Sequence, residues 1–189
     1  DAQESRGLGD VYKRQIIAYQ KANPGKMTFA SAGNGTSDHL TVELFWQQTH
    51  TKGIHVPYKG GAPAHTDLMG GQVDASFQNI NSVVQYIKAG KMRALAITSP
   101  KRSAVLPEVP TLAEAGVSNV EVTSWQAIVA PKGLPPAVQK AAHDAFVEAL
   151  NSEKVRNQFT SIGFEMVANT PEQFAAFQRQ EYDLSLIHI

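Results

Sequence analysis

Short apolar runs alternate with amphipathic segments along residues 16–98, and this alternation constrains the fold more than any other feature. Strands are predicted over residues 27–32, 54–58, 73–77 and 92–98, and helices over 16–22, 37–48, 62–69 and from the capping box Ser82-x-x-Gln85 to Gly90. The connections between them are short. Strands and helices that alternate in this way form doubly wound, mainly parallel sheets. The sequence therefore predicts an α/β fold.

The amino-acid composition changes downstream of this alternation. Residues 99–110 are rich in Pro, Lys, Arg and Ser and are predicted to form an exposed connection. Thr111-x-x-Glu114 predicts a short helix that ends at Gly116. Residues 120–130 form an extended run that is long for one strand and suited to pass from one lobe into another. Helices are then predicted over residues 136–150 and 152–161 and from the capping box that begins at Thr170, with a strand over 164–168.

The two ends of the chain share one DNA string. Residues 184–189 can be written CTG TCT CTT ATA CAC ATC, and the reverse complement translates as Asp-Val-Tyr-Lys-Arg-Gln, the sequence of residues 10–15. The string resembles the transposase adapter of sequencing libraries. We therefore expect residues 1–15 and 184–189 to be non-native and residues 16–183 to be a fragment of a longer reading frame, for which a missing signal peptide has no meaning.

Composition excludes several classes of function. The chain has 189 residues, a formal net charge of +0 and no long block of one charge, which argues against nucleic acid and anionic membrane as partners. No apolar run is long enough to span a bilayer, so direct membrane insertion is not expected. The chain has 0 Cys, which excludes disulfides, thiolate metal sites and cysteine nucleophiles.

Three loops that each follow a predicted strand carry the candidate binding residues; we call them corners. The first corner, residues 31–37, reads Ser-Ala-Gly-Asn-Gly-Thr-Ser. Its glycines permit close approach of the backbone, and the following helix directs N–H groups and a positive dipole at the corner. This chemistry suits an anion, although a Gly-rich turn before a helix also occurs for structural reasons alone. It has neither of the Gly patterns of nucleotide sites.

The second corner, residues 57–63, contains Tyr58, Lys59, Gly60 and Gly61, and the third corner, residues 77–79, contains Gln78 and Asn79. Lys59 can oppose a carboxylate or can simply be solvated. The amides of the third corner can donate to a ligand or satisfy the local backbone. Because ligands of open α/β sheets bind outside the carboxyl ends of the strands, we expect the three corners to form one binding site.

Catalysis and metal binding are not indicated. Ser37, Asp38 and His39 are adjacent, and neighbouring helical side chains diverge by about a hundred degrees. They cannot form a triad among themselves. His50 and His55 have no carboxylate at ligand spacing, so no metal site is predicted. An enzyme that uses the first corner for phosphate would still lack a nucleophile–base pair and a cofactor fingerprint. We predict no catalytic residues and no cofactor.

Longer motifs resemble a known family, the Bug-type solute receptors of tripartite tricarboxylate transporters. The resemblance covers nearly all of residues 16–183. It rests on residues 22–26, 31–36, 39–40, 43–45, 55–64, 67–73, 89–96, 106–111, 114–116, Trp125 and 130–131.

The resemblance implies a type II periplasmic-binding-protein fold, in which two α/β lobes joined by crossing strands close on a small acid. Residues 16–99 would be the ligand-binding second lobe, 100–124 the connection back to the hinge, and 125–183 a crossing strand and the C-terminal helices of an incomplete first lobe. The upstream strands of the first lobe and its Gly-rich loop would lie outside this sequence. The implied protein is periplasmic and hands its ligand to membrane permease subunits.

The resemblance and the three corners together give a set of candidate ligand contacts. These are Ser31, Gly33, Asn34, Gly35, Thr36, Ser37, His39, Tyr58, Gly60, Gly61, Gln78 and Asn79. The ligand class implied is a dicarboxylate, a tricarboxylate or a hydroxy acid. Many members of the family carry Asp where Gln78 stands, and a carboxylate there can neutralise a ligand ammonium. The neutral Gln78 favours an acid without an ammonium.

A second hypothesis remains open, in which the same kind of receptor acts as a sensor module and reports ligand occupancy to a signalling partner. Genes beside the reading frame would separate the two hypotheses, because permease genes indicate transport and a sensor kinase gene indicates signalling.

Overall fold

The computed structural model describes residues 15–188, with side chains up to residue 182. The chain divides between Ser124 and Trp125 into two compact units, which we describe separately. A helix over residues 15–22 opens the described part of the first unit. From residue 28 to residue 88, strands and helices then alternate in the order that the sequence predicts.

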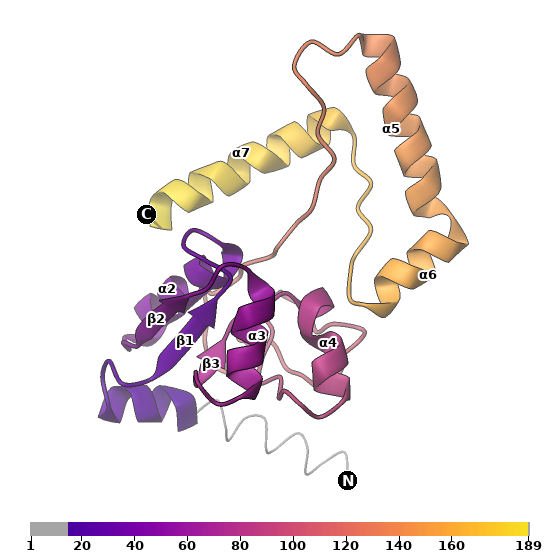
Figure 1. Cartoon of the computed structure of the whole chain (residues 1–189). Helices are drawn as coiled ribbons and strands as arrows, with labels where there is room; N and C mark the ends of the chain where they lie inside the picture. The colour runs from indigo at the N-terminus through magenta and orange to yellow at the C-terminus, as the bar shows by residue number, and fades with distance from the viewer. Residues whose placement is uncertain (1–14, 189) are drawn as a thin grey trace. The chain divides into compact units, whose positions relative to one another are not determined.

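A three-stranded parallel sheet forms the centre of the first unit (Figure 1). The strands are β1 (Thr28–Ser31), β2 (Ile54–Pro57) and β3 (Ala75–Ser76), in the order β2-β1-β3. Both pairings are parallel. All three strands therefore end at the same edge of the sheet, which we call the carboxyl edge. The predicted parallel α/β architecture is confirmed.

Helices cover both faces of this sheet. Successive strand residues point to opposite faces. Phe29 packs in one hydrophobic core with Val42 and Phe45 of α2 (Ser37–Thr49), whereas Ala30 packs in another with Ala64 of α3 (Gly61–Met69). The helices α2 and α3 therefore lie on opposite faces and fix the two turns that leave β1 and β2.

The helix α4 (Ile80–Lys88) begins earlier than its capping box predicts. Asn79 is the N-cap residue, and the Ser82 hydroxyl donates to the Asn79 carbonyl at 2.7 Å instead of capping a helix of its own. The predicted start at Ser82 is wrong because a serine in the first turn can bond back to the preceding turn.

The prediction of a strand over residues 92–98 is also wrong. The segment makes a single parallel bridge, Ile97 with Thr111. The capping box at Thr111 does form, since Glu114 N donates to Thr111 Oγ1 at 3.0 Å and Thr111 N donates to Glu114 Oε2 at 2.8 Å, but it closes turns and no α-helix. Three apolar residues that follow Thr111 pack in the core around Phe29; these are Leu112, Val117 and Val120.

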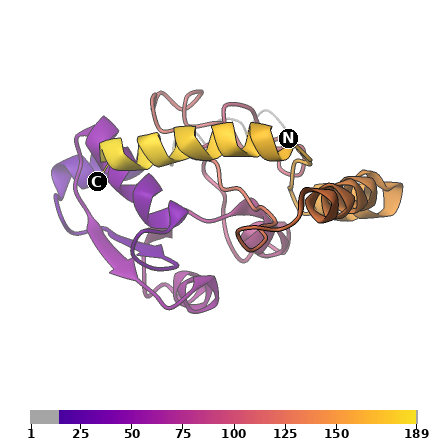
Figure 2. The ribbon, with the colours of Figure 1, turned by 90° about the horizontal axis from the view of Figure 1, so that it is seen from above.

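The second unit contains three helices among its described residues: α5 (Pro136–Asn151), α6 (Glu153–Ser161) and α7 (Pro171–His188). Figure 2 shows α7 as one continuous helix. Its capping box is confirmed, because Thr170 N donates to Gln173 Oε1 at 2.9 Å and Gln173 N donates to Thr170 Oγ1 at 3.3 Å.

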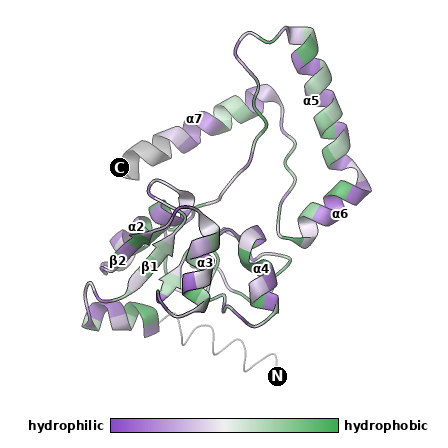
Figure 3. Cartoon of the chain, viewed as in Figure 1, coloured by the Kyte–Doolittle hydropathy of each residue, from purple (hydrophilic) through white to green (hydrophobic). Residues whose placement is uncertain are grey.

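Apolar side chains of the second unit remain exposed. Along the described residues 125–182, none is fully buried, and Ile128 and Val129 are 63% and 79% exposed. Figure 3 shows hydrophobic turns along α5. The strands predicted over residues 120–130 and 164–168 are absent here, because an extended segment becomes a strand only when a partner accepts its backbone hydrogen bonds. No described helix is apolar and long enough to cross a membrane.

Candidate ligand-binding site at the carboxyl edge

The three corners meet at the carboxyl edge of the sheet. Gly60 N donates to the Ala32 carbonyl at 2.9 Å, and a Cβ on Gly33 would lie 3.3 Å from the Tyr58 carbonyl oxygen, so the first and second corners adjoin. A Cβ on Gly61 would lie 3.9 Å from Gln78 Oε1, which joins the second corner to the third. Residues from three strand ends therefore form one continuous surface.

Thr36 caps the helix that begins at the first corner. Its hydroxyl donates to the Gly33 carbonyl at 2.7 Å and lies 3.5 Å from His39 N, which donates to it. Within the part of the chain that the structure describes, the backbone N–H groups of Asn34 and Ser37 have no acceptor. The first corner thus offers backbone donors at the positive end of α2, as anion binding requires.

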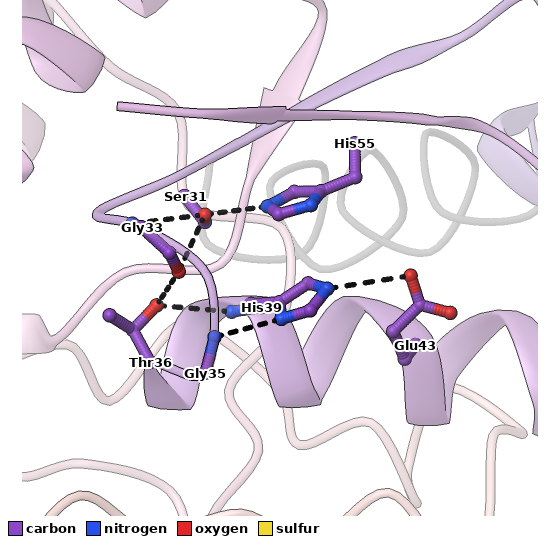
Figure 4. A network of polar contacts seen from close by, with 7 residues as sticks. All are labelled: Ser31, Gly33, Gly35, Thr36, His39, Glu43 and His55. Atoms are coloured by element: carbon purple, nitrogen blue, oxygen red, sulfur yellow. Dashed lines mark hydrogen bonds and ion pairs between the residues drawn. The ribbon is translucent and has the colours of Figure 1, made fainter. Parts of the chain in front are cut away.

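A pair of stacked histidines lies beside the first corner (Figure 4). The ring centroids of His39 and His55 are 4.1 Å apart. Gly35 N donates to His39 Nδ1 at 3.1 Å, so the proton of neutral His39 is on Nε2, which lies 3.7 Å from Glu43 Oε1. A ligand that uses the Gly35 N–H must replace His39 as its acceptor.

His55 is the residue of this pair that the candidate set lacks. Its Nε2 lies 2.6 Å from the hydroxyl of the fully buried Ser31. Ser31 therefore bonds inside the corner, since Gly33 N also donates to its hydroxyl at 3.2 Å. No signal in the sequence links His55 to His39, because one stands on β2 and the other on α2.

Acid is expected to destabilise the fold through His55. Burial, followed by the charge of neighbouring His39, lowers the pKa of His55 below its usual 6.5, although Glu43 opposes the change. The folded state therefore binds this proton less readily than the unfolded state. As far as His55 is concerned, the free energy of unfolding keeps its full value above about pH 6.5. It decreases as the pH falls from there through the pKa of His55 in the folded state.

Urea denaturation of the chain at a series of pH values between about 7.5 and 5 tests this expectation. His55→Gln should lose less stability over that range than the unmodified chain. Equal losses in the two proteins would contradict the assignment.

Asp38 holds the first corner in place through hydrogen bonds to its backbone and side chains. Its buried carboxylate accepts from Ala32 N at 3.1 Å and from Ser37. Burial raises the pKa of Asp38, and these hydrogen bonds together with the charge of His65 oppose the change. Sequence reasoning considered Asp38 only as a catalytic partner of its neighbours. The structure shows it tying the end of β1 to the start of α2.

The second corner is shaped by Tyr58 and two glycines. The Tyr58 hydroxyl donates to Asp67 Oδ2 at 2.7 Å, which raises the pKa of Tyr58 and directs the hydroxyl toward α3. Gly60 is the N-cap residue of α3 with a φ of 102°, a conformation that favours glycine. Gly61 opens the helix. The backbone of Gly60 and Gly61, more than the Tyr58 hydroxyl, is presented at the edge.

The third corner contains two side-chain amides, of which Gln78 is hydrogen-bonded within the protein and Asn79 has no such bond among the described residues. Gln78 Oε1 lies 2.8 Å from His65 Nε2, and Gln78 Nε2 donates to the Ser76 hydroxyl at 2.7 Å. Asn79 caps α4 through its backbone only, and its side chain makes no hydrogen bond within the described residues. In that same part of the chain no group of three side chains is arranged to hold a metal ion.

Comparison with known proteins gives a consistent result. Residues 12–185 match the tripartite tricarboxylate transporter family receptor. Protein BugT of Bordetella pertussis is 40% identical over 166 residues, which are 88% of this chain and 51% of BugT. A protein encoded in the tcbD-tcbE intergenic region of Pseudomonas sp. strain P51 is 38% identical, over 88% of this chain and 50% of its own length. The chain thus spans about half the length of these relatives.

Three solved structures have the same fold. The periplasmic binding protein BugD is 33% identical with a TM-score of 0.84, over 91% of this chain and 58% of BugD. A protein of R. palustris solved with adipate is 29% identical with a TM-score of 0.86, over 92% of this chain and 59% of its own. MatC of Rhodopseudomonas palustris with bound malate is 27% identical with a TM-score of 0.82, over 93% and 60%.

The fold predicted from the resemblance, a partial type II periplasmic-binding-protein architecture, is confirmed by these structures. The chain belongs to the receptor family of the tripartite tricarboxylate transporters, a family of binding receptors and not of enzymes.

Proposed function

We propose that the whole protein binds a small carboxylic acid in the periplasm and delivers it to the membrane permease of a tripartite tricarboxylate transporter. The observation that carries this proposal is the carboxyl edge of the sheet, where three corners adjoin. At the start of α2 the first corner presents backbone N–H groups that have no acceptor among residues 15–188. Two relatives of the same fold were solved with adipate and with malate, which are both dicarboxylates.

The candidate residues take different parts in this proposal. Backbone groups of Asn34, Gly35 and Ser37 donate to one ligand carboxylate, and the absent side chains of the glycines leave room for it. His39 releases the Gly35 N–H when the ligand arrives. The Asn79 side chain faces the rest of the ligand from the third corner. Ser31, Thr36 and Tyr58 shape the loops, because their hydroxyls are bonded within the protein.

We further propose that residues 16–99 form the second lobe, 100–124 the connection to the hinge and 125–183 part of the first lobe. The division of the chain between Ser124 and Trp125 supports this assignment. The exposed side chains of Ile128, Val129 and Phe146 support it as well, because a lobe with more strands would bury them.

A thermal-shift screen of the full-length receptor tests ligand class. An acid at 100 times its Kd stabilises the folded state by about 2.7 kcal/mol, so the matching dicarboxylate should raise Tm by about 5 °C or more. Tricarboxylates, hydroxy acids and phosphate serve as comparison ligands. A screen in which phosphate alone raises Tm would overturn the carboxylate assignment. Loss of acid uptake on deletion of either the receptor gene or its permease genes would establish delivery.

A further inference from the structure

His65 is a buried histidine that the binding proposal does not use. It stands on α3, is 7% exposed, and packs against the Tyr86 ring in a T-shaped pair with centroids 5.9 Å apart. Its Nε2 lies 2.8 Å from Gln78 Oε1. A Cβ on Gly61 would lie 3.4 Å from the His65 ring, so this histidine lies directly beneath the surface where the second and third corners meet.

The hydrogen bonds that leave His65 run in one direction only. The Ser76 hydroxyl lies 2.7 Å from the Ala30 carbonyl and 3.2 Å from the Phe77 carbonyl, and both of these can only accept. The Ser76 proton is therefore committed to the backbone. Its oxygen must then accept from Gln78, which places the Gln78 NH2 group at Ser76 and leaves Oε1 facing His65. Since Oε1 can only accept, His65 donates from Nε2.

This chain of donors leaves one Gln78 N–H to spare. The NH2 group has two protons, and one of them bonds to Ser76. The other has no acceptor among the residues that the structure describes. Reversal of the amide would set its oxygen against the Ser76 oxygen, which has no proton left to donate, and its NH2 group against the His65 N–H. The Ala30 carbonyl of β1 thus fixes the orientation of the Gln78 amide through Ser76, and His65 holds the amide oxygen by donating to it.

We propose that His65 is a positioning residue that holds Gln78 as a hydrogen-bond donor and so selects ligands that present an oxygen acceptor at the third corner. This inference rests on the proposed carboxylate binding at the same edge. A carboxylate, hydroxyl or carbonyl oxygen of the ligand can accept a hydrogen bond from the spare Gln78 N–H. An ammonium group can only donate, so it would place its own N–H groups against that donor. The selection is therefore stronger than a merely neutral residue at position 78 would give.

Nuclear magnetic resonance of the 189-residue chain tests the direction of the hydrogen bonds without any ligand. Once the ring nitrogen shifts show that the imidazole is neutral, long-range proton–nitrogen correlation should show the His65 proton on Nε2. One of the two Gln78 amide protons should exchange slowly. A neutral His65 with its proton on Nδ1 would overturn the proposal.

Binding by the full-length receptor tests the selectivity. Malate and aspartate differ only in a hydroxyl against an ammonium. His65→Leu removes the donor and should lower the preference for malate over aspartate about tenfold, the effect of one lost hydrogen bond. His65→Gln keeps a donor at similar reach and should restore the preference. A purely structural role for His65 would weaken both acids equally, and equal weakening would overturn the inference.

The two experiments separate this inference from the proposed function. If the receptor binds neither malate nor any other carboxylic acid, the proposed function fails and the selectivity fails with it, whatever the tautomer of His65. If it binds carboxylates with a malate-to-aspartate ratio that His65→Leu leaves unchanged, the function stands and the positioning role is refuted.

Discussion

Valine in place of Gly35 is expected to weaken carboxylate binding by the full-length receptor by more than about 100-fold, which corresponds to about 2.7 kcal/mol. Gly35 has a φ of 75°, and a Cβ built on it would meet no atom within 4 Å. The damage would therefore come from the backbone and not from a collision. A β-branched residue avoids left-handed conformations, so the first corner must rearrange and its N–H groups must turn away.

Gly25→Val is the matched control for this substitution. Gly25 has a φ of 71° and equally open surroundings, but it precedes β1 and lies at the opposite edge of the sheet. Both variants should lose a comparable 1–2 kcal/mol, roughly, of folding stability, measured by urea denaturation. Calorimetric titration should show binding lost in Gly35→Val alone. Undiminished affinity in Gly35→Val would remove the first corner from the site.

Aspartate in place of Gln78 is expected to turn the preference of the receptor toward amino acids. The new carboxylate accepts hydrogen bonds and carries a negative charge, so it repels a ligand oxygen and attracts an ammonium. An unpaired buried charge costs several kcal/mol, and partial solvation at the third corner reduces this to about 10- to 100-fold in the affinity ratio. The quantity to measure is the ratio of aspartate to malate affinities by calorimetry.

Two further variants sharpen this result. Gln78→Glu keeps the length of the side chain and its reach to His65, so it should shift the ratio in the same direction with less disturbance of the loop. Gln72→Asp adds the same charge in the turn before β3, at the other edge of the sheet, and should leave the ratio unchanged. Tighter binding of aspartate than of malate by the unmodified receptor would refute the interpretation of Gln78.

The sequence predicts the sheet of the first unit well because its signals are local. The strands β1 and β2 are short runs followed within three residues by glycine, and the turn into α2 is marked by the capping residue Thr36. Residues 92–98 carry an equally good apolar run, yet they form one bridge because pairing depends on a distant partner. The same argument accounts for residues 120–130.

The corners of the site could be predicted, but their internal bonds could not. Glycines and hydroxyl residues before a helix are visible in the sequence, whereas the contact of His55 with Ser31 joins residues 24 positions apart. The tie between His65 and Gln78 spans 13 positions and depends on how α3 packs on β1. Such contacts are decided by tertiary packing, which leaves no periodic pattern in a single sequence.

The unequal burial of the two units bears on the thermodynamics of unfolding. The heat capacity increment of unfolding grows with the apolar surface that becomes hydrated. Phe29, Val42 and Phe45 are buried in a hydrophobic core of the first unit, whereas the described residues of the second unit include no fully buried side chain. Most of the increment measured by calorimetry on this chain should therefore come from residues before Trp125, and the curvature of its stability with temperature should describe that unit.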